Sequence, residues 1–300
     1  MSISEQSGFS ALSKSAAALA HLMLRPQLIA FVCLALLVFA GWGWVALHAG
    51  SLASEAGFTG LGPGMAIFDR LALPGWLTTL CRSLIPVYTD PGWQSLAVSF
   101  LMWAAMSAAM MLPSAAPMVV TYAEIADTAA RKGEPIVSPL ILIAGYLTVW
   151  LLFSIAAAAL QLMLQAYTLA SAAGQLTSPY LAAALLCGAG LYQFSALKQA
   201  CLAKCRRPFT FFLANWRDTA SGVLKLGLRQ GVYCLGCCWA LMLLMLVVGT
   251  MNIVWMALFG ALMIAEKTVT QSAPLRKATG IALLFAAIAV AASLVFDHMV

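Results

Sequence analysis

Long apolar stretches recur along this 300-residue chain, and they constrain its fold more than any other feature. A run of about 20 apolar residues matches the hydrocarbon core of a bilayer, which is about 30 Å thick. Seven such runs are separated by shorter polar segments, at residues 28–49, 95–122, 140–167, 180–197, 231–248, 252–265 and 280–296. The pattern predicts an all-α, polytopic membrane helix bundle with about seven transmembrane helices.

The composition of the chain excludes the soluble classes of protein. Hydrophobic residues make up 63% of the chain and charged residues only 9%, whereas soluble domains average about 25% charged residues. A soluble enzyme and a disordered chain are both excluded on this ground. No tract of lysine and arginine interleaved with aromatic residues indicates nucleic-acid binding. We therefore expect membrane lipid, and no nucleic acid, as a partner.

The placement of lysine and arginine predicts the orientation of the bundle. If the N-terminus is cytoplasmic, every lysine and arginine except Arg70 and Arg82 falls in a cytoplasmic segment, as the positive-inside rule requires. We therefore predict a multi-pass protein of a bacterial inner (plasma) membrane, with a cytoplasmic N-terminal segment at 1–27 and one transmembrane domain at 28–297. An outer loop is expected at about 50–94, with a short helix near 65–82, and a basic cytoplasmic loop at about 198–229.

Five of the eight cysteines form two groups with helical spacing. Cys234 and Cys238 are four residues apart with Cys237 between them, and Cys201 and Cys205 repeat the spacing. Residues at i and i+4 share one face of a helix, and the predicted orientation places both groups at the cytoplasmic side. Because the cytoplasm keeps thiols reduced, these five residues are candidate ligands for a soft metal, Cu(I) or Zn(II). The alternative is that they pack as small apolar residues.

The second apolar run carries a methionine stripe and two prolines. Met102, Met106 and Met110 recur every four residues, and thioethers are soft ligands for Cu(I), although methionine is also a common packing residue. Pro113 and Pro117 interrupt this span, which is tolerated where the backbone is buried in protein or lines a cavity. Four methionines are weaker candidate ligands: Met106, Met110, Met242 and Met251.

An acidic residue at a membrane edge is the last candidate ligand. Glu266 ends the sixth apolar run, and an ionisable residue at such a depth is a functional candidate. It would be a hard partner for the metal, and the alternative is an ion pair with the adjacent Lys267. No motif for a nucleotide or for nucleophilic catalysis is present, so no catalytic residue is assigned.

Several stretches resemble a bacterial family of uncharacterised, predicted metal-binding integral membrane proteins. They cover residues 102–117, 191–208, 231–242 and 249–256 and the pair Glu266-Lys267, so the resemblance spans about 95–270. It implies a membrane helix bundle that binds a metal. The family often has histidine at the position of Gln230, so this chain lacks that side chain.

These observations favour a membrane protein that binds or handles a soft transition metal, with copper favoured, through cytoplasm-facing cysteines. Delivery of the metal to a membrane enzyme, exchange with a metallochaperone, or export would each suit the pattern. Two other classes stay open. One is a membrane thiol or redox enzyme, and the other is a small-solute transporter or partner subunit without metal chemistry.

Overall fold

The computed structural model of this chain describes residues 26–69, 76, 79, 83, 92–133, 137–171, 173–269 and 272–297. Within these residues the fold is all-helical, as predicted. The five longest helices are α3 (Pro26–Ala56), α6 (Trp93–Arg131), α7 (Pro139–Ala166), α11 (Ala220–Leu243) and α14 (Ala273–Asp297). The shorter helices are η1 (Phe58–Leu61), α4 (Ala66–Asp69), α8 (Pro179–Phe194), α9 (Ala196–Cys205), α10 (Pro208–Asn215), α12 (Met245–Val248) and α13 (Ile253–Thr268).

Five helical segments of the described chain are long and apolar enough to cross a membrane. They are Leu28–Ala53, Trp93–Ala129, Pro139–Ala166, Ala220–Val248 and Ala273–Leu294. A sixth candidate is the bent pair α8 and α9. Helix α13 has 16 residues, or about 24 Å at 1.5 Å per residue, which is shorter than a hydrocarbon core of about 30 Å. A helix bundle able to span a membrane is thus confirmed, whereas the count of about seven spans is not.

Helices α8 and α9 meet at an angle of 64° at Ser195. This residue has an extended backbone, and its side chain accepts a hydrogen bond of 3.1 Å from the backbone N–H of Lys198. Serine is a favoured N-cap because its oxygen satisfies an orphan N–H of the new helix. The predicted span at 180–197 therefore contains a bend, which directs α9 toward α11 and carries Cys201 and Cys205 with it.

Two other predicted segments differ from the structure. Helix α6 continues through Pro113 and Pro117 to Arg131, so the prolines do not end it, and it is longer than the predicted run at 95–122. The predicted outer loop is partly helical, because α3 extends to Ala56 and α4 occupies Ala66–Asp69. Most of the region 70–91, with Arg70, Cys81 and Arg82, lies outside the described residues, as does 1–25.

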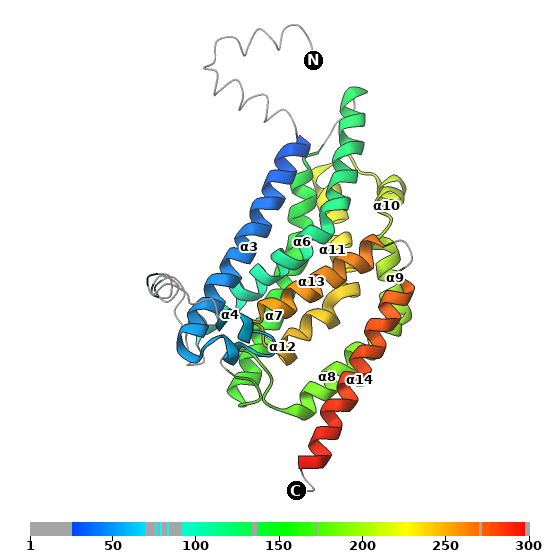
Figure 1. Ribbon diagram of the computed structural model, residues 1–300. Helices are drawn as coiled ribbons and strands as arrows, with labels where there is room; N and C mark the ends of the chain where they lie inside the picture. Colours follow the sequence, from blue (N-terminus) through cyan, green and yellow to red (C-terminus); the bar gives the residue numbers. More distant parts are fainter. Residues whose placement is uncertain are drawn as a thin grey trace.

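The helices pack along their lengths, with α3 against α6, α6 against α7, and α7 against α11. Figure 1 shows α8 and α14 side by side at one side of the bundle, and the start of α3 and the end of α14 at opposite ends of it. Glycines bring α7 and α11 into backbone contact: a Cβ on Gly145 would lie 2.4 Å from the Leu224 carbonyl oxygen, and one on Gly227 would lie 2.2 Å from the Leu142 oxygen. Small residues permit such close approach in membrane bundles.

Candidate metal centre

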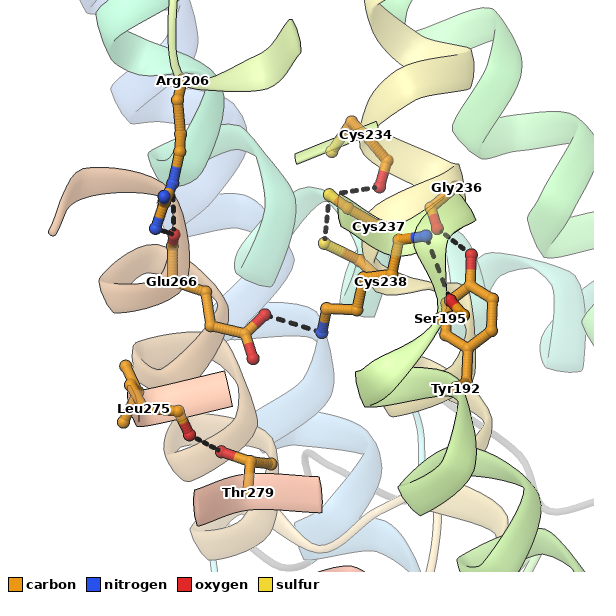
Figure 2. A network of polar contacts seen from close by, with 11 residues as sticks. Tyr192, Ser195, Arg206, Cys234, Gly236, Cys237, Cys238, Glu266, Leu275 and Thr279 are labelled. Atoms are coloured by element: carbon orange, nitrogen blue, oxygen red, sulfur yellow. Dashed lines mark hydrogen bonds and ion pairs between the residues drawn. The ribbon is translucent and has the colours of Figure 1, made fainter. Parts of the chain in front are cut away.

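Three cysteines of α11 form a buried thiol cluster. Cys234, Cys237 and Cys238 are all buried, and the sulfur atoms of Cys237 and Cys238 lie 3.2 Å apart. The Cys237 thiol also donates to the backbone carbonyl of Cys234 across 3.1 Å, and Figure 2 shows both contacts. The helical spacing predicted a shared face for Cys234 and Cys238, and the structure brings Cys237 together with them.

The two cysteines of α9 approach the same cluster from the neighbouring helix. The Cys205 side chain interacts with that of Cys237. The Cys201 sulfur packs against the bare backbone of Gly236, where an added Cβ would lie 2.6 Å from it. Cys237 therefore links the other three of these cysteines, Cys205, Cys234 and Cys238, by pairwise contacts, and Cys201 lies at the border of the cluster.

A lysine and a tyrosine that were not predicted as site residues hold the Cys234 thiol. The Lys267 ammonium lies 3.0 Å from the Cys234 sulfur and also donates to the Ser114 hydroxyl across 2.7 Å. The Tyr146 hydroxyl lies 3.0 Å from the same sulfur. A positive charge beside a thiol favours the thiolate, which is the form that binds metal. The cluster is thus joined to α13, α6 and α7 through one sulfur atom.

Glu266 forms an ion pair, but not with the adjacent Lys267. Its carboxylate lies 2.7 Å from the Lys198 ammonium, and the two side chains are only 2% and 1% exposed. The Arg206 guanidinium donates to the backbone carbonyl of Glu266, a contact that Figure 2 shows. The predicted alternative of a Glu266–Lys267 pair was wrong, because successive residues of α13 point to different neighbours. Within the described chain the structure does not join the Glu266 carboxylate to the thiols.

The candidate methionines are buried in the core of the bundle. Met106, Met110, Met242 and Met251 are each at most 2% exposed. Of the described methionines, only Met163 is exposed. The four belong to one continuous apolar core that also contains the three α11 cysteines. Both packing and copper-binding methionines are buried, so the connection of these methionines to the thiols bears more on copper binding than their burial does.

The backbone of Met111 connects the methionine stripe to the thiol cluster. Its carbonyl oxygen accepts hydrogen bonds from the Tyr146 hydroxyl at 3.2 Å and from the Ser114 hydroxyl at 2.8 Å. These hydroxyls also contact Cys234 and Lys267. The α6 stripe therefore begins one residue away from the groups that hold the Cys234 sulfur.

Gln230 occupies the position one helical turn before Cys234. Its side chain is buried, and its amide nitrogen has no hydrogen-bond partner among the described residues. Buried polar groups are normally paired with protein or water. The structure therefore leaves an unpaired buried donor one helical turn before Cys234.

The donor set of this cluster is soft, since it consists of thiols with buried thioethers nearby. Thiolates and thioethers select Cu(I), whereas structural Zn(II) prefers four ligands in a tetrahedron. No group of three or more His, Cys, Asp or Glu side chains in the described part of the chain is already arranged around a metal position. The paired thiols instead suit an ion of low coordination number.

The comparison with protein families decides the classification. The model of the PpoB2 family, described as copper chaperones, matches residues 100–290, which contain the thiol cluster, Lys267 and the methionine stripe. The chain belongs to the PpoB2 copper chaperone family. No curated protein and no solved structure shows a significant match. The link to copper that was expected from the residues is thus confirmed at the level of the family.

Proposed function

We propose that this PpoB2-family protein is a membrane copper chaperone that holds Cu(I) on the thiolates of Cys234, Cys237 and Cys238, with Cys205 at the edge of the site. The observation that carries the proposal is the contact between the buried Cys237 and Cys238 thiols beside Cys234, whose sulfur lies 3.0 Å from a lysine ammonium. Soft, low-coordinate Cu(I) matches a set of closely spaced sulfur donors. Cys201 has a supporting role at the border of the site, whereas the Glu266 carboxylate is paired with Lys198.

Charge balance supports this assignment. A Cu(I) ion bound by two of these three thiols in their thiolate form carries a net charge of about −1, and an unpaired buried charge is costly. The Lys267 ammonium, 3.0 Å from the Cys234 sulfur, supplies the compensating positive charge. Because Lys267 also binds Ser114, it is held in place before the metal arrives.

The methionines provide a route away from the thiols. Met110, Met106 and Met102 follow one another along α6 and are buried, and Met110 lies against Gly260 of α13. Thioethers are soft ligands that bind Cu(I). We infer that copper leaves the cluster along this stripe toward the opposite end of the bundle, where a membrane enzyme or an outer metallochaperone receives it.

The orientation that we propose follows the positive-inside rule, with the thiol cluster near the cytoplasmic face of a bacterial inner membrane. Asp218 is exposed in the turn between α10 and α11, so an Asp218→Cys variant reports on this face. In intact cells, a membrane-impermeant maleimide should label the new thiol only after permeabilisation. Labelling of intact cells would place the cluster on the outer side and reverse the direction of transfer.

Copper binding by the purified protein tests the proposal directly. We expect detergent-purified, reduced protein to take up near-stoichiometric Cu(I) in competition with a chromophoric Cu(I) chelator. A Cys234→Ser/Cys237→Ser/Cys238→Ser variant should lose this binding, and Cys187→Ser, a half-buried cysteine outside the cluster, should keep it. Equal copper in the triple variant and the wild type would contradict the proposal. A parallel Zn(II) titration identifies the preferred metal.

A further inference from the structure

A cavity of about 730 Å³ lies between the end of α9, helix α10 and the end of α13. Four cationic side chains line it, those of Lys204, Arg206, Arg207 and Lys267. Its lining contains no acidic residue. Phe211 and Val269 give it an apolar part. Pockets of about 300–1,000 Å³ accommodate small organic ligands. The lining therefore suits a small anion with some apolar or aliphatic surface.

Lys267 belongs both to this cavity and to the thiol cluster. It lines the cavity, and its ammonium contacts the Cys234 sulfur at 3.0 Å. One side chain thus separates the ligand space from a candidate copper ligand. The cavity has the position of an entry site, because a ligand bound in it meets Lys267, which contacts the thiol that the copper must reach.

The other three cationic side chains of the cavity differ in whether they form hydrogen bonds with the protein. Arg206 is fixed by hydrogen bonds of 2.9 Å to the backbone carbonyls of Glu266 and Val269. Lys204 and Arg207 are exposed, and the side chain of neither forms an ion pair or hydrogen bond with another described residue. Two positive charges are therefore free to meet a ligand, and guanidinium groups match carboxylates in a bidentate manner.

We propose that this cavity binds a small, carboxylate-bearing thiol that carries Cu(I), and that copper passes from this anionic donor complex to Cys234. The proposal rests on the proposed function and names the class of its copper donor. The carboxylates meet Lys204 and Arg207, while the copper-bearing sulfur points toward Lys267. A free phosphate or a lipid headgroup matches the charge of the cavity but brings no metal to the thiol.

The transfer is a ligand exchange without a change of oxidation state. Each copper–sulfur bond to the donor that breaks is replaced by a bond from copper to a protein thiolate. A proton released by a protein thiol is taken up by the departing donor thiolate. Copper enters and leaves as Cu(I), so no oxidant or reductant takes part.

Three reagents separate the cavity from the metal site. Glutathione is a carboxylate-bearing thiol, and its Cu(I) complex is an anionic donor, whereas the Cu(I)–acetonitrile complex is cationic. S-methylglutathione keeps the carboxylates but has no free thiol. The variant Lys204→Gln/Arg207→Gln removes the two free charges and leaves Lys267 and the cysteines intact. Lys225→Gln/Lys277→Gln removes two exposed charges that do not line the cavity and is the matched control.

We expect S-methylglutathione to bind the wild type and the control in phosphatidylcholine nanodiscs, as measured by calorimetry, and not the cavity variant. Loading from Cu(I)–glutathione should be about tenfold slower in the cavity variant, while loading from Cu(I)–acetonitrile is unchanged. Absence of S-methylglutathione binding to the wild type, or equal loading rates in all three proteins, would overturn the inference.

Two further outcomes are distinct from these. Displacement of S-methylglutathione by phosphatidylglycerol in the nanodisc would assign the cavity to a lipid headgroup and also overturn the inference. Failure of Cu(I)–acetonitrile to load the wild type would instead contradict the proposed function, and the copper-free binding of S-methylglutathione would still decide what the cavity binds.

Discussion

The ammonium of Lys267 on α13 lies 3.0 Å from the sulfur of Cys234 on α11. These residues are 33 positions apart in the chain. Among the described residues, the Lys267 ammonium is the only charged group in contact with a sulfur atom of the thiol cluster. Tyr146 contacts the same sulfur from α7. The Cys234 thiol is therefore the point at which three helices meet, and the copper chemistry of the protein should depend on it.

Replacement of Lys267 by methionine should weaken Cu(I) binding. A hydrogen bond to a charged group contributes about 1.5–3 kcal/mol, which corresponds to a loss of about 10–100-fold in affinity. Because the thiolate loses its charge partner, the pH at which binding is half-maximal should rise. Chelator competition across a pH series measures both effects, and Lys277→Met is the control. An unchanged pH profile would show that Lys267 does not support the thiolate.

The buried pair of Lys198 and Glu266 should contribute to stability and not to copper stoichiometry. Removing one partner leaves an uncompensated buried charge, so Lys198→Met should destabilise the fold by about 3–5 kcal/mol. The double variant Lys198→Met/Glu266→Leu removes both charges and should recover much of this loss. Thermal unfolding in detergent and copper content per folded chain are the two measurements. Loss of copper from a stable Glu266→Gln variant would make Glu266 a ligand after all.

The contact between α7 and α11 should be sensitive to single methyl groups. A Cβ on Gly145 or Gly227 would clash with backbone atoms of the facing helix, and overpacking of this kind costs about 1–3 kcal/mol. We expect Gly145→Ala and Gly227→Ala each to lower the unfolding temperature and to loosen the contact of Tyr146 with Cys234. Gly188→Ala, where no atom lies within 4 Å, is the matched control. Equal unfolding temperatures for all three variants would contradict this account.

The methionine stripe should affect the release of copper more than its binding. Leucine preserves the volume of methionine at a cost of less than about 1.5 kcal/mol but removes the sulfur. Met106→Leu/Met110→Leu should therefore fold and bind Cu(I) at the cysteines, yet transfer it more slowly to an external chelator. Met163→Leu, at an exposed position, should transfer copper at the wild-type rate. Equal transfer rates would make the stripe a packing feature.

Much of the site follows from local spacing. The spacing of four residues predicted that Cys234 and Cys238 share a helical face. The same spacing predicted that the methionines of α6 lie on one face of that helix. Lys267 was seen only as a neighbour of Glu266, and Tyr146 and Ser114 gave no signal, since single tyrosines and serines in apolar runs are common. Their roles depend on contacts between helices, which no pattern within one helix encodes.

The sequence by itself determined the all-helical membrane fold. Backbone N–H and C=O groups in a hydrocarbon layer must form their hydrogen bonds within each segment, and the length of each apolar run can be counted directly from the sequence. It also determined which donors are soft. Only the tertiary structure decided the bend at Ser195, which brings Cys205 to Cys237. It also decided that Glu266 pairs with Lys198, and that Lys267 contacts Cys234 and not its neighbour Glu266. Those choices depend on how helices rotate and approach one another, and packing across the whole bundle sets both.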